Sequence, residues 1–413
     1  MRLAGALAAV SLTLVSAACT SERSGTGGPA STPTEAAVSV TSSVGASAEA
    51  VTVSSEDCPE PARTADGFQA ASVPSGWELL AAGERGALRG GVVTADGALW
   101  ALREEGQGDL TLRRWKDGRW EAVAGPPGMK PGALAASPGG GIWVAQPGEG
   151  MWSDTGTWKV GVREGGGWRT LALDVPDQKA GGGSADAHGG WMTFSTVAVH
   201  WDGANWKRMN LPAGQEDVGG FSDVDAYRLS GSAEEIWAVP LTGATAVRLR
   251  DGVSQTVQFT LRIDAKEAIH DTQGGLFYPQ AVAVVGADDR WLLGTAAFGT
   301  HYLDENEDTV AGRLVAVRHT RGEWTCTWGP FHREQFDGAF VDAVPDGDGG
   351  LWAATAHGTL WHLGDGRWTR QRLPADEGAE PNVNDLVVGG DQIYALGWVA
   401  SQGRFHGALW RAG

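Results

Sequence analysis

A short aromatic motif recurs seven times along this chain, and this repetition constrains the fold more than any other feature. In most copies, small or turn residues precede an aliphatic residue, an aromatic residue and small apolar residues, as in "GGLWAAT" at 349–355. The aromatic positions are Trp100, Trp143, Trp191, Trp237, Trp291, Trp352 and Tyr394. Their spacing runs from 42 residues (Trp352 to Tyr394) to 61 (Trp291 to Trp352). Such a period indicates a repeat architecture.

The second half of each repeat predicts a β-hairpin. "WHLGDGRWTRQRLP" at 361–374 and "LRRWKDGRWEAV" at 112–123 each place an Asp-Gly turn between two strand-like segments. With the aromatic strand and one strand before it, each repeat has four antiparallel strands. One such sheet cannot cover both of its faces, but seven packed radially can, with the aromatic residues between them. The sequence therefore predicts an all-β, seven-bladed β-propeller over residues 58–413.

The two ends of the predicted ring complement each other. The last repeat stops at "HGALWRAG", residues 406–413, one strand short of a blade. The segment "PSGWELLAAG" at 74–83 resembles the outer strand "DGRWEAVAG" at 117–125. We therefore expect the segment around Trp77 to join the last blade as its outer strand, which would protect an unpaired edge.

The first residues predict export. Met1-Arg2 is followed by an apolar run to Ala18, which is shorter than the roughly 20 residues of a membrane span and fits a signal peptide over 1–18. "LVSAAC" resembles a bacterial lipobox, which implies a lipidated Cys19, although Ser16 stands where that pattern usually has Leu. Ordinary cleavage followed by secretion is the alternative.

Residues 19–57 are predicted to be a disordered tether. They are rich in Ser, Thr, Gly and Pro and contain no aromatic residue, Leu or Ile. Such a segment buries too little apolar surface to offset the entropy of ordering it. As a coil it would reach roughly 35 Å.

The remaining cysteines, Cys58 and Cys326, are expected to form a disulfide, because an exported protein meets an oxidising compartment. Cys58 precedes the closing strand, and Cys326 falls on the predicted outer strand of the fifth blade. Residues 58–73 would then run along the outer rim across two blades. Two unpaired buried thiols are the alternative.

Two family resemblances add to this picture over roughly residues 74–413. "LWAATAHGTLWHL" resembles the repeat of two-component-regulator propellers, and the W-x-G-x-W hairpins are similar to those of galactose-oxidase-like, or Kelch-like, propellers. These resemblances imply an architecture and no activity. Lys is much rarer than Arg in this chain, which is typical of a GC-rich genome. We therefore expect a bacterial lipoprotein from an actinobacterium.

Catalytic signatures are missing from the sequence. It has no H-E-x-x-H, G-x-S-x-G or P-loop motif and no Cys/His spacing of a zinc site, so we assign no catalytic residue and no metal ligand. His357 and His362 share a hairpin, where we expect them to face solvent. The net charge of −18 disfavours nucleic-acid binding.

An aspartate recurs on the predicted innermost strands, as Asp225, Asp342 and Asp385. These carboxylates could ring one mouth of the channel, where like charges would need a cation such as Ca²⁺ between them. Otherwise we expect no cofactor. The alternative is that each Asp accepts hydrogen bonds from backbone amides at a turn.

Insertions at 261–280 and 329–340 offer further candidate ligand-binding residues. Tyr278, His332 and Arg333, with Phe277 and Phe336, would present aromatic platforms and a cation to a sugar, peptide or anion. Loops on a rigid scaffold often carry binding residues, although insertions without function are also tolerated.

The sequence thus favours a non-catalytic propeller, lipid-anchored to the outer face of the cytoplasmic membrane. It would bind an envelope protein, a glycan or a peptide and contact the membrane through its anchor alone. "GGGIWVA" at 139–145 also resembles the repeats of streptogramin-lyase-type propellers, which implies a metal-dependent lyase or hydrolase as an alternative. The His/Glu/His set of that family has no recognisable counterpart here. A structural scaffold of an envelope complex is a third possibility.

Overall fold

The computed structural model of the chain is all-β. The unit Glu35–Gly413 holds every described residue, and Met1–Thr34 lies outside them. The described residues are 36–42, 49–61, 70–106, 108–146, 152–153, 157–174, 180–181, 185–188, 190–194, 197–202, 204–211, 227–231, 235–240, 243–250, 253–263, 275–297, 312–332, 340–401 and 403–413. The described part therefore does not include the predicted signal peptide, Cys19, Asp225, Arg333 or Phe336.

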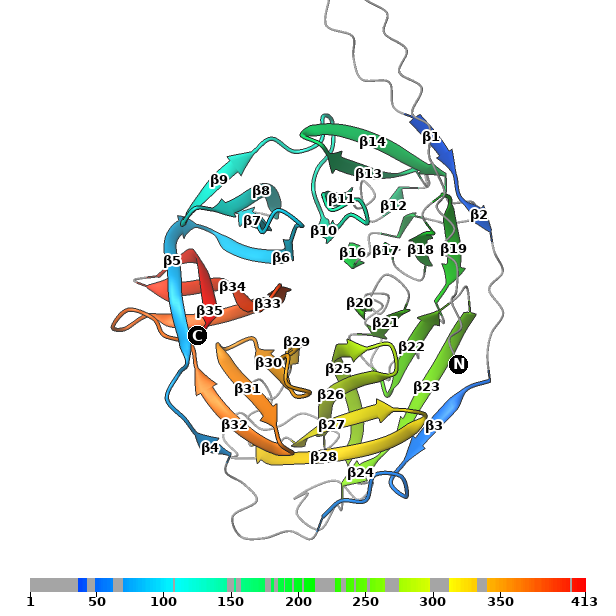
Figure 1. The fold of residues 1–413 in the computed structure, drawn as a ribbon, viewed down its shortest axis with the longest axis vertical. Coiled ribbons are helices and arrows are strands. Elements are labelled where there is room, and N and C mark those ends of the chain that lie inside the picture. The colour runs from blue at the N-terminus through cyan, green and yellow to red at the C-terminus, as the bar shows by residue number, and fades with distance from the viewer. Residues whose placement is uncertain are drawn as a thin grey trace, which may run out of the picture. The chain divides into compact units, whose positions relative to one another are not determined.

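Seven four-stranded antiparallel sheets surround one axis and form a β-propeller (Figure 1), as predicted. Blades 1 to 3 are β6(Ala87–Val93)–β7(Leu99–Glu105)–β8(Asp109–Lys116)–β9(Arg119–Val123), β10(Ala133–Ala136)–β11(Ile142–Gln146)–β13(Thr157–Glu164)–β14(Gly167–Asp174) and β16(Ala185–His188)–β17(Trp191–Phe194)–β18(Val197–Trp201)–β19(Trp206–Asn210). Blades 4 and 5 are β20(Tyr227–Gly231)–β21(Glu235–Pro240)–β22(Thr245–Arg250)–β23(Val253–Thr260) and β25(Gly275–Gly286)–β26(Asp289–Ala297)–β27(Gly312–Thr320)–β28(Glu323–His332). Blades 6 and 7 are β29(Phe340–Pro345)–β30(Leu351–Thr355)–β31(Thr359–Gly364)–β32(Arg367–Arg372) and β33(Glu380–Gly389)–β34(Gln392–Ser401)–β35(Arg404–Ala412)–β5(Trp77–Arg85). The short strand β24(Arg262–Ile263) pairs with β25, and β12(Trp152–Ser153) pairs with β15(Ala180–Gly181).

The ring closes as the sequence predicted. Strand β5 pairs antiparallel with β35, and the register places Trp77 opposite Ala412. The amide of Gly413 also donates a hydrogen bond of 2.8 Å to the carbonyl of Gly76. The N-terminal strand therefore completes the blade that the C-terminal strand leaves unfinished.

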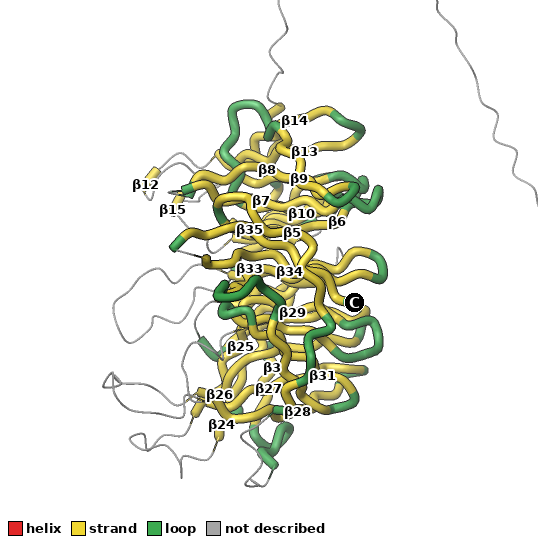
Figure 2. The backbone as a smooth tube through the Cα atoms, turned by 90° about the vertical axis from the view of Figure 1, so that its left-hand side faces the viewer, coloured by secondary structure: helices red, strands yellow, loops and turns green. Residues whose placement is uncertain are grey.

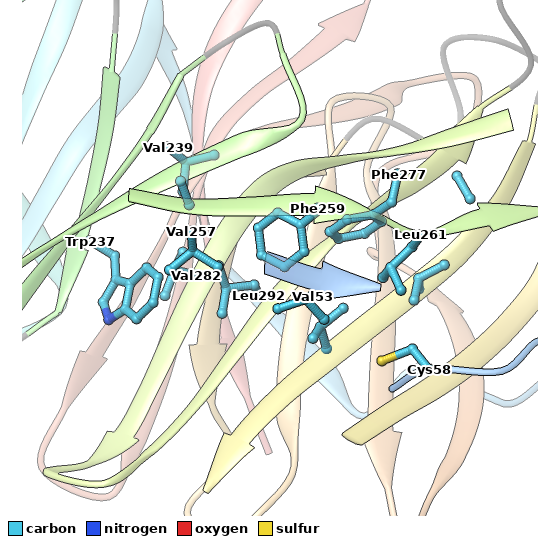
Figure 3. Packing of buried hydrophobic residues seen from close by; sticks show 14 residues of the cluster. Val53, Cys58, Trp237, Val239, Val257, Phe259, Leu261, Phe277, Val282 and Leu292 are labelled. Atoms are coloured by element: carbon cyan, nitrogen blue, oxygen red, sulfur yellow. The ribbon is translucent and has the colours of Figure 1, made fainter. Parts of the chain in front are cut away.

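The hydrophobic core consists of seven clusters, and each lies between two consecutive blades. Between blades 4 and 5, one cluster contains Trp237, Phe277, Val282 and Leu292 (Figure 3). Each of the seven motif aromatics belongs to, or packs against, a different cluster. The predicted role of these aromatics, to fill the spaces between blades, is confirmed.

The Asp-Gly turns form tight hairpins, also as predicted. Asp117 and Gly118 have φ values of 52° and 77°, and Asp365 and Gly366 have 50° and 70°. Positive φ at both central residues is the signature of a type I′ turn, whose twist matches that of the flanking strands.

The N-terminal segment departs from the expected tether. Strands β1(Ala36–Ser39), β2(Thr41–Ser42), β3(Val51–Ser54) and β4(Ala71–Ser72) each add to the outer edge of a blade, parallel to its outermost strand. They pair with β14, β19, β23 and β32, in blades 2, 3, 4 and 6 (Figure 1). We call the described residues 36–42, 49–61 and 70–76 the strap.

The expectation of disorder is therefore wrong for residues 36–42 and 49–57. The composition argument considered the apolar surface of the segment alone. The blades offer unpaired outer edges, and pairing with them satisfies the backbone of the strap. Valines of the strap also pack against the blades, since Val40 is 5% exposed and Val53 is fully buried.

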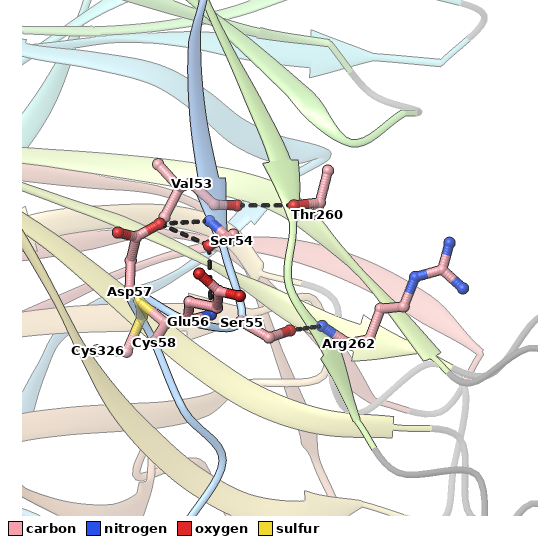
Figure 4. Close-up of a disulfide and its surroundings, with 9 residues drawn as sticks. All are labelled: Val53, Ser54, Ser55, Glu56, Asp57, Cys58, Thr260, Arg262 and Cys326. Atoms are coloured by element: carbon pink, nitrogen blue, oxygen red, sulfur yellow. Dashed lines mark hydrogen bonds between the residues drawn. A yellow bond between two sulfur atoms is a disulfide. The ribbon is translucent and has the colours of Figure 1, made fainter.

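The expected disulfide joins Cys58 to Cys326, with 5.3 Å between their Cα atoms (Figure 4). Cys326 lies on β28, the outer strand of blade 5, where the repeat pattern placed it. Beside it, Glu60 and Arg313 form an ion pair of 2.7 Å in which both side chains are largely buried. The strap is thus attached to blade 5 covalently and electrostatically.

Candidate functional site

The innermost strands of four consecutive blades carry an irregularity at corresponding places. The pairing register shifts between Pro279 and Ala281 in β25, and between Phe340 and Asp342 in β29. It shifts again between Val383 and Asp385 in β33, and between Arg89 and Val92 in β6. A β-bulge redirects side chains and is common near functional sites. These bulges are therefore the first candidate for a site at the ring axis.

Side chains at three of these bulges accept hydrogen bonds from backbone amides of the next blade. Gln280 Oε1 accepts a hydrogen bond of 2.9 Å from the amide of Phe340, in blade 6. Asp342 Oδ2 accepts one of 2.7 Å from the amide of Leu386, in blade 7. Asp385 accepts one from the amide of Gly91, in blade 1. We call Gln280, Asp342 and Asp385 the axial acceptors.

Further hydrogen bonds cross the axial end of the blades. Arg228 Nη1, in blade 4, donates a hydrogen bond of 2.7 Å to the carbonyl of Phe340, in blade 6. Asn384 Nδ2, in blade 7, donates a hydrogen bond of 2.9 Å to the carbonyl of Leu88, in blade 1. Because these hydrogen bonds and those of the axial acceptors link several blades, they make the axial region a rigid support.

Of the predicted aspartates, Asp342 and Asp385 follow the hydrogen-bonding alternative. Both accept hydrogen bonds from backbone amides of the next blade, and Asp342 Oδ1 also accepts one of 2.8 Å from the adjacent amide of Ala343. No group of three or more His, Cys, Asp or Glu side chains that could hold a metal ion occurs among the described residues. Those residues also include no helix with the length and apolarity of a membrane span.

Replacing Asp342 with alanine is expected to destabilise the protein by about 1–3 kcal/mol, because the Leu386 amide loses its acceptor inside a blade interface. Asp342→Asn keeps an acceptor oxygen and should lose less. Urea unfolding of both variants measures the difference. An equal loss in the two variants, or stabilisation of the wild type by added Ca²⁺ that Asp342→Ala abolishes, would contradict the acceptor role.

The predicted insertion residues do not all behave as ligand candidates. Tyr278 lies on β25, opposite Thr295, and is partly exposed. Phe277 is fully buried and its ring lies 5.1 Å from that of Phe259, so its expected role as an exposed platform is wrong. Strand alternation explains this, because Phe277 points into the space between blades 4 and 5. His332 ends β28, where its backbone pairs with Gly312.

Sequence reasoning missed a recurring group of three side chains. The residue opposite the motif tryptophan on the next strand is Arg or His in five blades, in the pairs Trp100–Arg114, Trp191–His200, Trp237–Arg248, Trp291–Arg318 and Trp352–His362. His200 stacks on Trp191 at 4.0 Å, and the Arg318 guanidinium lies 4.8 Å from the Trp291 ring. Such stacking stabilises the pairs through the aromatic face.

An acidic residue completes four of these groups. Asp96 accepts a hydrogen bond of 2.6 Å from Arg114, and Glu235 accepts one of 2.6 Å from Arg248. Asp289 accepts two hydrogen bonds from Arg318, of 2.7 and 2.5 Å. His362, expected to face solvent, is half-buried, stacks on Trp352 and lies 2.8 Å from Asp346. An acidic residue shortly before the motif aromatic, with Arg or His on the following strand, is the sequence signal for these groups.

The most buried charges described lie between blades 4 and 5. Glu235 is 4% exposed, and Arg290 is fully buried and paired with it. Burial opposes the charge of Glu235, but hydrogen bonds from Arg248 and Trp237 and the charge of Arg290 outweigh it and lower its pKa. Burial and the nearby Arg290 and Arg248 also lower the pKa of His319. This group sits inside a blade interface, which suits a structural role.

The two faces of the ring differ in their connections. On one, the hairpin face, the described turns at 117–118, 165–166, 321–322 and 365–366 are tight (Figure 2). On the other, the loop face, consecutive described strand ends are far apart in sequence, as from Ile263 to Gly275, Ala297 to Gly312 and His332 to Phe340. Long connections on a rigid scaffold are where recognition residues gather.

Comparisons with known proteins identify no family for the chain. No family model and no curated protein matches the chain. Solved structures that it resembles include YCF48 bound to D1 peptide (14% identity, 84% of this chain and 99% of that one covered, TM-score 0.49) and YCF48 from Cyanidioschyzon merolae (16%, 81% and 98%, 0.48). The WD40 β-propeller domain of Doa1 is similar at 13% identity, 81% and 97% coverage and a TM-score of 0.44. The resemblance to two-component-regulator and Kelch-like repeats stays a prediction.

Proposed function

We propose that the protein is an exported propeller, lipid-anchored through Cys19 at the outer face of the cytoplasmic membrane. Its loop face binds an envelope protein or a peptide segment of one, without catalysis. The observation that carries this proposal is the asymmetry of the ring. Tight type I′ turns occupy one face, and the long connections of blades 4 to 6 leave from strand ends on the other.

The axial region supports a binding role over a catalytic one. The carboxylates of Asp342 and Asp385 accept hydrogen bonds from backbone amides and join consecutive blades. A general acid or base must instead reach a substrate proton. The axial acceptors therefore provide a rigid base for the loop face, and rigidity lowers the entropic cost of binding.

Site-specific photo-crosslinking tests the proposed face in cells that display the full chain. A photoreactive residue replaces Glu377 or Arg404, both exposed at the loop face. Arg367 and Asp391, exposed at the hairpin face, are the matched controls. We expect one specific adduct from both loop-face positions and none from the controls. Adducts from the hairpin face alone, or from no position, would contradict the proposal.

The lipid anchor gives a separate prediction. Cells grown with radiolabelled palmitate should label the wild-type protein, and Cys19→Ser should abolish the label, because the thiol of Cys19 is the acceptor. The variant should also leave the membrane fraction. A labelled Cys19→Ser protein, or an unlabelled wild type, would show that the export signal is an ordinary cleavage site.

A further inference from the structure

The strap and the closing strand β5 belong to one continuous piece of chain. At its C-terminal end, β5 is followed directly by Gly86 and by β6, so the chain itself holds Arg85 on blade 1. At its N-terminal end, Trp77 is held through the strap. Any release of β5 from β35 must therefore begin at Trp77, because only this end can move away.

The disulfide fixes that end. Cys58 precedes β5 in the chain and is bonded to Cys326 in blade 5, while β5 completes blade 7. The intervening segment crosses blade 6, where β4 pairs with β32 and the Val73 amide donates 3.0 Å to the carbonyl of Arg370. With both ends attached, a released β5 stays close to its partner strand, which favours pairing again.

Among the described residues, non-covalent contacts also hold the strap between Glu60 and Trp77. Glu60 pairs with Arg313, which also donates from Nε to the carbonyl of Gly329 at 2.8 Å. Nearer to β5, the Gly76 amide donates 3.0 Å to Gln371 Oε1. Strand β4 itself pairs over Ala71 and Ser72 alone. The disulfide thus adds a covalent attachment to the ion pair, hydrogen bonds and short strand that hold the described residues of the strap on blades 5 and 6.

We propose that the Cys58–Cys326 disulfide is a redox clasp for the seam between β5 and β35. Oxidised, the clasp pins both ends of β5 and keeps the ring shut. Reduced, the seam opens locally from Trp77, and β35 exposes an unpaired edge. This inference does not depend on which face of the ring binds a partner.

The opening step is a thiol–disulfide exchange with a dithiol reductant. A thiolate of the reductant attacks the sulfur of Cys326, which is the more exposed residue of the pair. The bond to the sulfur of the buried Cys58 breaks, and Cys58 leaves as a thiolate that takes up a proton. The second thiol of the reductant then releases Cys326 as a thiol. The protein gains two electrons and two protons, and the dithiol becomes a disulfide.

Hydrogen exchange followed by mass spectrometry tests the clasp on the full chain. Folded wild-type protein is compared before and after reduction with dithiothreitol under native conditions, so the test does not depend on a variant that folds. We expect exchange in β5 and β35 to accelerate at least tenfold on reduction. Strands β17 and β18 of blade 3, far from the seam in the ring, are the internal control and should not change.

The Cys58→Ser/Cys326→Ser variant provides the second measurement. It should exchange like reduced wild type, stay unaffected by dithiothreitol, and melt roughly 5–10 °C below the oxidised protein. Equal acceleration in all seven blades would mean that the bond stabilises the fold globally and would overturn the clasp. Unchanged exchange at β5 and β35 would also overturn it.

Discussion

Replacing Glu235 with alanine is expected to cost about 3–5 kcal/mol of folding free energy. The side chain is 4% exposed and paired with the fully buried Arg290, so the variant leaves a buried guanidinium without its carboxylate. Arg248 and the Trp237 indole also lose an acceptor, at 2.6 and 2.9 Å. Guanidinium chloride unfolding measures the loss.

A surface pair is the matched control for this variant. Glu121 lies 3.2 Å from Arg119, and the two side chains are 40% and 75% exposed. Glu121→Ala should therefore cost less than about 1 kcal/mol. The double variant Glu235→Ala/Arg290→Met removes both charges and should recover part of the stability. If Glu235→Ala loses no more than Glu121→Ala, the buried group does not hold blades 4 and 5 together.

Acid should remove the same contribution in the wild type. The pKa of Glu235 is lower in the folded protein than its ordinary value, so its contribution to stability is complete above that ordinary value. It is lost as the pH falls through the lowered pKa.

The second large effect is expected at the seam. Trp77→Ala should cost about 3–5 kcal/mol, because the indole is 5% exposed and packs edge-to-face on Trp352 at 5.5 Å. The residue also starts the strand that closes the ring, opposite Ala412. Denaturant unfolding gives the loss, and near-ultraviolet circular dichroism reports the change around Trp352.

Trp120 provides the comparison in blade 1. It occupies the outer strand β9, packs at a tilt against Trp115 with 5.3 Å between the ring centroids, and is more exposed than Trp77. Trp120→Ala removes the same number of atoms from a blade that does not close the ring. We expect a smaller loss there. A loss at Trp77 no greater than at Trp120 would mean that the seam contributes nothing special to stability.

The sequence predicted the features that local patterns determine. The motif aromatics gave the number of blades, the Asp117-Gly118 and Asp365-Gly366 turns gave the hairpins, and the unfinished last repeat gave the pairing of Trp77. Each of these follows from spacing, from turn conformation or from a missing strand, which can be read without coordinates.

What the sequence did not predict depends on neighbours that are distant in the chain. The amide of Gly91 donates a hydrogen bond to the carboxylate of Asp385, and no local sequence pattern relates these two positions. The prediction of disorder for the strap was wrong for a similar reason. Its composition is that of a coil, but its pairing partners are the outer edges of complete blades. The group of Asp346, His362 and Trp352 was readable in principle, since its members share one hairpin and the turn before it.

The strap also determines when the protein can fold. Its residues leave the ribosome before any blade, yet Thr41 pairs with Lys207, Val51 with Val257 and Ala71 with Thr369. Trp77 cannot pair until Ala412 has been synthesised. Pairings of such long sequence separation form slowly, so the ring stays open at least until strand β35 is available. Such late closure would suit the export proposed above, because a chain must be unfolded to pass through a translocation channel.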